Sequence, residues 1–279
     1  MCAILLLRGP DMNTFRHSGK LGDIIYSLPA VRGLGGGIFY VDHQTQYPEK
    51  PPLGRDTALM MVDLLETQDC IQRADLYDGT PIRYDLDEFR SKALPVHIFN
   101  SIKHGTDDLA GSLFGGFVKE LRRHLVPKLE VDLPQFHWES VGLPGRADLT
   151  KPWITGIQKK SLADLVVCKT VRYSGTLDWA ELKPYSKRSI FVGLEHEWRS
   201  FCENYFQIDF YKAENLVDLT HVIAGAKLFV GNQSLGLALA DAMLIPRVAQ
   251  LWDESPNRMS PANAHRVLTH ALVTTYIDS

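Results

Sequence analysis

Short apolar runs alternate with longer segments of helical period through the second half of the chain, and this alternation restricts the fold strongly. Each apolar run has the length of a strand and ends near glycine, proline or polar residues. Parallel strands need crossover connections, which helices usually supply, so the alternation predicts a parallel sheet covered by helices. The predicted strands are 165–168, 189–193, 227–231 and 246–251, and the predicted helices are 195–206, 216–224 and 234–243.

The first half repeats the alternation with longer connections between the elements. Its first helix contains Pro29, and proline removes a backbone donor, so we expect this helix to kink or end there. The predicted strands of this half are 12–17 and 37–42, and the predicted helices are 22–34, 56–67 and 113–125.

A stretch rich in proline and glycine, residues 143–156, separates the two halves. We place a domain boundary near residue 155, which gives domains at 1–155 and 156–279. The sequence therefore predicts an α/β fold with two Rossmann-like domains. Because ligands of open α/β sheets bind at the carboxyl ends of the strands, we expect both domains to face a central cleft.

The composition excludes several classes of protein. The 279 residues are 45% hydrophobic and 23% charged, which is ordinary for a folded protein and excludes global disorder. The formal net charge of -3 gives no support to nonspecific binding of nucleic acid. The chain has no apolar run near the roughly 20 residues of a membrane-spanning helix. Its four cysteines form no paired motif, so we expect a cytoplasmic protein with reduced thiols.

The first segment of chemical interest, residues 17–29, joins a predicted strand to a predicted helix through a glycine-containing turn. Leucine follows Gly19 and Lys20, so the segment is not a P-loop. Gly22 lets a ligand approach the backbone closely, and Asp23 lies at the start of the helix. Taken alone, these residues allow two interpretations of Asp23: a partner of the helix dipole, or a functional carboxylate at the cleft.

The second segment, residues 226–246, joins a strand to a helix through the polar turn Asn232-Gln233-Ser234. The first turn of a helix has free backbone N–H groups and a positive dipole end, so this turn is a candidate phosphate site. A structural interpretation also remains open. Ser234 can simply cap the helix, and the small residues Gly236, Ala238 and Ala240 can serve close packing on the sheet.

Together the two segments resemble the signatures of the heptosyltransferase-like branch of the GT-B glycosyltransferases, a glycosyltransferase family 9-like branch. The resemblance implies a GT-B-like fold with an acceptor-side first domain and a second domain that binds a nucleotide sugar. It rests on Gly22-Asp23 with the apolar helix around Pro29, on Gly231-Asn232-Gln233-Ser234 with the alanine-rich helix and Pro246, and on residues 218–227.

The resemblance also implies roles for individual residues in transfer of a sugar from a nucleotide-diphosphate sugar to a hydroxyl. Asp23 would be the general base for the acceptor, because a hydroxyl needs one near neutral pH. Cations and N–H groups would stabilise the leaving diphosphate, so we expect an inverting reaction with no metal and no tightly bound cofactor. The donor-side candidates are Gly22, Lys169, Arg172, Glu195, Asn232, Gln233 and Ser234, and the acceptor-side candidates are His17, His43 and His104.

Two other functions stay open at this point. One is a phage-type enzyme that glycosylates a hydroxymethylated base in DNA instead of a saccharide. The other is a nonenzymatic nucleotide-sugar binder, motivated by Ala238, because the family usually has a histidine near this position. The DNA hypothesis needs a basic stripe along the cleft, for which the candidates are Lys103, Lys119, Arg122, Arg123 and Lys128.

Overall fold

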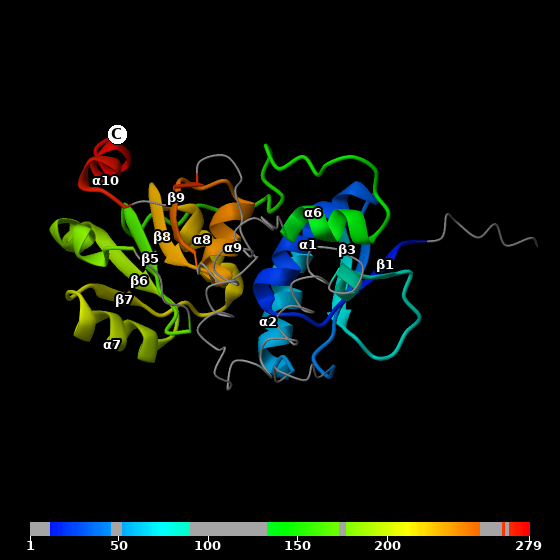
Figure 1. Ribbon diagram of the computed structural model, residues 1–279. Helices are drawn as coiled ribbons and strands as arrows, with labels where there is room; N and C mark the ends of the chain where they lie inside the picture. The colour runs from blue at the N-terminus through cyan, green and yellow to red at the C-terminus, as the bar shows by residue number, and fades with distance from the viewer. Residues whose placement is uncertain (1–11, 46–51, 90–132, 173–176, 252–263, 266–267) are drawn as a thin grey trace, which may run out of the picture.

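The computed structural model describes residues 12–45, 52–89, 133–172, 177–251, 264–265 and 268–279. Two α/β lobes lie side by side, the first built from the first half of the chain and the second from the second half (Figure 1). Each lobe has its own parallel sheet, so the predicted α/β fold class with two Rossmann-like halves is confirmed.

The sheet of the first lobe has the strand order β3-β2-β1-β4, with all pairs parallel. Helices connect its first three strands; the alternation predicted the first two strands and both helices, but not β3 or β4. The elements of this lobe are β1 (Thr14–His17), α1 (Leu21–Gly33), β2 (Gly37–Val41), α2 (Arg55–Glu66), β3 (Ile71–Leu76), β4 (Tyr84–Asp85), the 3₁₀ turn η1 (Leu86–Glu88) and α6 (Leu133–Ser140).

The second sheet has the order β10-β9-β8-β5-β6-β7, again with all pairs parallel. Its predicted strands and helices agree with the structure to within two residues at each end. Its elements are β5 (Leu165–Cys168), the 3₁₀ segment η3 (Trp179–Arg188), β6 (Ser189–Val192), α7 (Glu195–Asn204), β7 (Asp209–Tyr211), α8 (Leu216–Ala224), β8 (Leu228–Asn232), α9 (Leu235–Ala242), β9 (Arg247–Gln250), β10 (Ala264–His265) and α10 (His270–Ile277).

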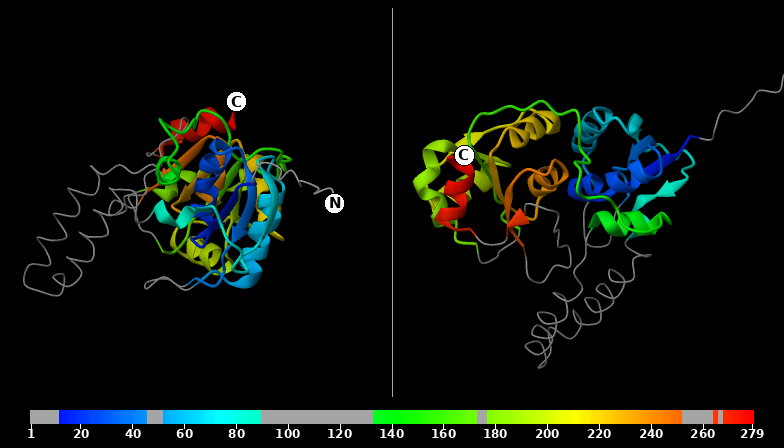
Figure 2. Two further views of the ribbon diagram at one scale, coloured as in Figure 1. Left: turned by 90° about the vertical axis from the view of Figure 1, so that its right-hand side faces the viewer. Right: turned by 90° about the horizontal axis from the view of Figure 1, so that it is seen from above.

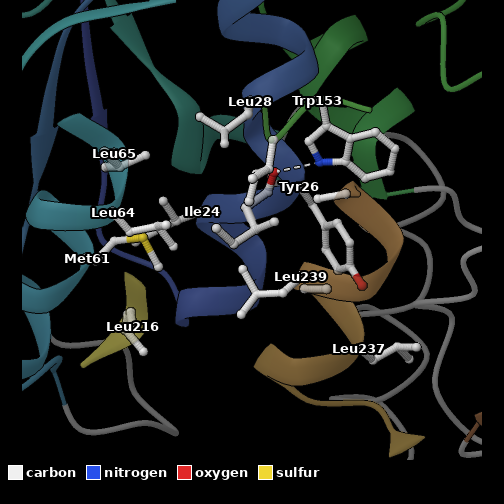
Figure 3. Close-up of a cluster of buried hydrophobic side chains, with 14 of the residues drawn as sticks. Ile24, Tyr26, Leu28, Met61, Leu64, Leu65, Trp153, Leu216, Leu237 and Leu239 are labelled. Atoms are coloured by element: carbon white, nitrogen blue, oxygen red, sulfur yellow. Dashed lines mark hydrogen bonds between the residues drawn. The ribbon is translucent and has the colours of Figure 1, made fainter. Parts of the chain in front are cut away.

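Helix α1 runs through Pro29 to Gly33, so of the two outcomes expected at the proline, a kink or an end, the structure excludes the end. Pro29 has no N–H to donate to the carbonyl oxygen of Ile25, one turn earlier. The indole Nε1 of Trp153 donates to that oxygen instead, at 3.1 Å (dashed line in Figure 3). The side chain that replaces the missing donor comes from a distant part of the chain, so the local sequence gives no sign of it.

A continuous apolar core joins the two lobes. It runs from Phe15 and Ile24 in the first lobe to Leu237 and Leu239 on α9 in the second. Helix α1 packs against α9, and helix α2 packs against α8, as the view from above in Figure 2 and the close-up in Figure 3 show. The relative position of the lobes therefore depends on a buried interface between helices.

Several predictions fall on parts of the chain outside the described residues. These are the helix at 113–125 and the candidate basic stripe of residues 103–128. The boundary near residue 155 lies between α6 and β5, and it stays a prediction. Among the described helices, none combines the length and the apolar character that crossing a membrane requires.

Candidate active site

The first part of the candidate site is the start of α1, where β1 leads through Ser18, Gly19 and Lys20 into the helix. Asp23 lies in the first helical turn and is partly exposed. Because β1 is parallel to its neighbours, this turn lies at the carboxyl end of the first sheet, where ligands bind in α/β folds.

The second part is the start of α9, at the carboxyl end of the second sheet. Ser234 is the N-cap of this helix, and its hydroxyl accepts a hydrogen bond from the N–H of Leu237 at 3.4 Å. Gly231, just before the turn, has no room for a side chain, because a Cβ there would lie 2.8 Å from the backbone oxygen of Cys168. The strand end and the helix start are thus held close to β5.

The two helix starts meet. A Cβ placed on Gly22 would lie 3.6 Å from the Cβ of Ala238 and 3.9 Å from the carbonyl oxygen of Ser234. One turn further along each helix, the hydroxyl of Tyr26 donates to the carboxylate of Asp241 at 2.9 Å. Both helices therefore begin on the same side of the interface, and their positive dipole ends act together on an anion placed there.

Lys169 is a further donor-side candidate, at the end of β5, the strand that pairs with β8. Lys169 follows β5 directly, and its ammonium group lies 5.7 Å from the ring centre of Tyr205. Burial lowers the pKa of Lys169, and the charge of Glu197 acts in the opposite direction. Arg172, three residues further on, is exposed to solvent.

Asn232 and Gln233 precede Ser234 in the same turn. The side-chain amide of Asn232 is hydrogen-bonded to the backbone of Thr170. Its Oδ1 accepts from the N–H of Thr170 and its Nδ2 donates to the carbonyl of Thr170, both at 2.8 Å. The side chain is fully buried and fastens the end of β8 to the segment after β5. Gln233 is partly exposed in the same turn.

The carboxylate that the structure places beside Lys169 is Glu197 rather than Glu195. Glu195 is exposed and pairs with Arg199 one turn along α7, at 2.5 Å. Glu197 is buried, and its carboxylate accepts from the N–H of Leu194 at 3.1 Å. Glu197 lies three residues after Leu194, the N-cap of α7, but leucine has no side-chain acceptor, so the sequence lacks the full capping-box pattern that would have marked this glutamate.

Two of the three acceptor-side histidines fall in the described chain. His17 is fully buried, and its Nδ1 accepts from the N–H of Gly19 at 2.8 Å, so its ring lies within the turn rather than on an open surface. His43 is partly exposed after β2, and His104 lies outside the described residues. Within the ranges that the structure describes, no group of three or more His, Cys, Asp and Glu side chains could hold a metal ion.

The architecture is of the GT-B type, with two parallel α/β lobes that meet along α1 and α9. No protein-family model matches the sequence, and no curated protein matches it either. Among solved structures, the chain is similar to Escherichia coli ADP-heptose LPS heptosyltransferase II, with a TM-score of 0.50 and 15% identity over 92% of this chain and 90% of that one.

Two further solved structures are similar at lower scores. The E. coli heptosyltransferase WaaC, solved with ADP-2-deoxy-2-fluoro heptose, has a TM-score of 0.49 and 13% identity over 95% of this chain and 98% of that one. A family 9 glycosyl transferase from Veillonella parvula has a TM-score of 0.46 and 11% identity over 92% of this chain and 85% of that one. At 15% identity, the likeness to heptosyltransferase II shows the fold alone.

Proposed function

We propose that the protein is a glycosyltransferase that moves a sugar from a nucleoside-diphosphate sugar to a hydroxyl acceptor. The observation that carries the proposal is the meeting of the starts of α1 and α9. It joins a carboxylate, Asp23, to a helix start suited to phosphate, at the carboxyl ends of both sheets. A base and an anion site side by side are what this transfer requires.

In the proposed reaction Asp23 takes the proton of the acceptor hydroxyl as its oxygen attacks the anomeric carbon. The bond from that carbon to the diphosphate breaks at the same time, on the opposite face, so the configuration inverts. The first-turn N–H groups of α9 and the ammonium of Lys169 stabilise the charge that grows on the diphosphate. This arrangement supplies the stabilisation from the chain's own groups, without a resident metal or cofactor.

The class of donor is also a proposal. The E. coli protein of similar fold is an ADP-heptose LPS heptosyltransferase. We therefore place sugars activated by adenosine diphosphate first among donors, and a saccharide hydroxyl first among acceptors. Hydroxymethylated DNA is the other acceptor class to be tested.

The test is release of nucleoside diphosphate from a panel of nucleotide sugars, with and without hydroxymethylated DNA. The Asp23→Asn variant should lower kcat about 100-fold or more, the usual effect of losing a general base. The matched control is Asp56→Asn, which removes an exposed carboxylate from the first turn of another helix, α2, and should leave kcat unchanged.

Each outcome separates two interpretations. Turnover of one donor that disappears in Asp23→Asn supports the proposal, and stimulation by DNA would decide for that acceptor. Thermal stabilisation by a nucleotide without turnover of any donor would favour a nonenzymatic binder. Unchanged turnover in Asp23→Asn would exclude Asp23 as the base.

A further inference from the structure

The helix that carries Asp23 begins without a side-chain cap. The N-cap residue of α1 is Lys20, and its side chain makes no capping hydrogen bond. By contrast, Ser234 caps α9, and Asn215 and Thr269 cap two other helices of the second lobe. The residues just before a helix set where the helix begins, so contacts that fix the turn Ser18–Lys20 also fix the start of α1.

The turn before α1 is held by Asp87. This residue lies in η1, directly after β4, the strand that pairs with β1. Its Oδ2 accepts from the backbone N–H of Ser18 at 2.8 Å and from the Ser18 hydroxyl at 2.5 Å. One carboxylate thus takes both donors of the residue that lies three positions before α1 begins. Hydrogen bonds to a charged acceptor are roughly twice as strong as neutral ones, so the contact holds the turn firmly.

The neighbouring residue of the turn is held in the same place. The N–H of Gly19 donates to Nδ1 of His17 at 2.8 Å, so this nitrogen has no hydrogen for Oδ1 of Asp87, which lies 3.1 Å away. His17 is fully buried against the rings of Phe89 and His137, so it cannot turn away. Two consecutive backbone N–H groups are therefore fixed, one by Asp87 directly and one by the histidine beside it.

Asp87 is in turn held from below. Its own N–H donates to Oδ1 of Asp85 at 3.0 Å, which starts the η1 turn. Nη1 of Arg16 lies 2.7 Å from Oδ2 of Asp85 and 3.8 Å from Oδ2 of Asp87, so its positive charge offsets part of their negative charge. The carboxylate of Asp87 is mostly buried, so water competes little for its contacts.

We infer that Asp87 is a positioning residue for the proposed reaction: it holds the turn Ser18–Lys20 so that Asp23 faces the acceptor hydroxyl. The inference rests on the proposed function. Asp87 acts through the turn and has no contact with substrate in this role. Because the donor phosphate site lies on α9, removal of Asp87 should slow the chemical step and leave donor binding unchanged.

The test compares Asp87→Ala and Asp87→Asn with a matched control, Asp42→Asn. Asp42 is even more buried than Asp87 and pairs with the same Arg16, but its carboxylate contacts Arg16, Gln44 and Thr45, not the turn. Steady-state kinetics would give kcat and the donor KM, and hydrogen–deuterium exchange would report on the amides of residues 18–24 and 234–240.

We expect Asp87→Ala to lower kcat about 100-fold, the size of effect that a displacement near 1 Å at a reacting group produces. Asp87→Asn keeps one acceptor oxygen and should lose less. The donor KM should stay within about threefold of wild type because α9 is undisturbed. Amide exchange should rise in residues 18–24 but not in 234–240, and Asp42→Asn should change neither kcat nor exchange in 18–24.

An unchanged kcat in Asp87→Ala, or an equal loss of kcat in Asp42→Asn, would overturn the inference. Failure of the proposed function has a different signature, because wild type would then turn over no donor at all. Exchange would still decide the structural part in that case. Protection of residues 18–24 that is unaltered in Asp87→Ala would show that Asp87 does not hold the turn.

Discussion

Replacement of Asp241 by asparagine should be among the most damaging conservative changes in this chain. Asp241 lies on α9 at the interface between the lobes, and its carboxylate pairs with Nε of Arg247 and accepts from Tyr26. Arg247 is fully buried, and its Nη1 also donates to the carbonyl of Ile245 at 3.0 Å. Asparagine keeps the shape of the side chain but takes away the negative charge that Asp241 places against the guanidinium.

The magnitude follows from the burial of that charge. Removing one partner of a buried ion pair costs about 3–5 kcal/mol, because arginine cannot give up its proton and stays charged in the core. The asparagine oxygen can still accept from Tyr26, so this contact adds little to the loss. For a urea m-value of about 3 kcal/mol/M, the unfolding midpoint should fall by roughly 1 M or more.

Urea unfolding followed by circular dichroism would measure the shift. The control is Asp278→Asn, which breaks the exposed pair between Asp278 and Arg188 and should leave the midpoint within error. The double variant Asp241→Leu/Arg247→Met should recover most of the loss, because it removes both charges together. A midpoint for Asp241→Asn within about 0.3 M of wild type, near 1 kcal/mol, would refute the reasoning.

Three further predictions concern the core and its turns. Burial first, and then Asp241, raise the pKa of Tyr26 well above 10.0, so the unfolded chain loses this proton at lower pH than the folded one. The free energy of unfolding should therefore fall above pH 10, by up to about 1.4 kcal/mol per pH unit. Urea midpoints measured between pH 9 and 11 should fall less in Tyr26→Phe than in wild type, because the variant has no phenol to titrate. Gly36→Ala and Gly142→Ala both place alanine at a positive φ, of 76° and 79°, but only at Gly36 would the new Cβ lie 2.2 Å from a backbone oxygen. Gly142→Ala should cost about 1–2 kcal/mol of backbone strain and Gly36→Ala clearly more, so equal losses in thermal unfolding would contradict the steric argument. Burial raises the pKa of Cys168 to about 12, so this thiol should resist alkylation at pH 8 in the folded protein and react after unfolding, as peptide mapping would show.

The sequence predicted the elements of the second lobe well because their signals are local. Periodicity and end residues define helices α8 and α9, and Asn215 caps α8 as predicted. The strands that escaped prediction all lie at sheet edges: β7 and β10, which are too short to show a pattern, and β3 and β4 in the first lobe. These strands exist because a neighbouring strand offers its backbone, and that information lies elsewhere in the chain.

In the candidate site, too, local motifs could be predicted, whereas contacts between distant parts of the chain could not. Gly22 and Ser234 could be singled out from local motifs, but their proximity depends on how two lobes pack. The role of Asp87 was not predictable, because it requires β4 to lie beside β1 although 69 residues separate Asp87 from Ser18. Glu197 was missed for a different reason: Glu195 lies nearer to the strand end, and the capping-box pattern that would mark Glu197 needs serine or threonine where this chain has Leu194.

The buried polar contact between the lobes bears directly on the geometry of the site. Tyr26 lies one turn after Gly22 on α1, and Asp241 lies one turn after Ala238 on α9. An apolar interface alone would permit the two helices to slide along or rotate against each other, because apolar contacts have little directional preference. The hydrogen bond from Tyr26 to Asp241, with Arg247 behind it, is satisfied in one alignment only. That alignment brings the two helix starts level, so the same pair of helices that carries the candidate base and the candidate phosphate site also fixes their separation.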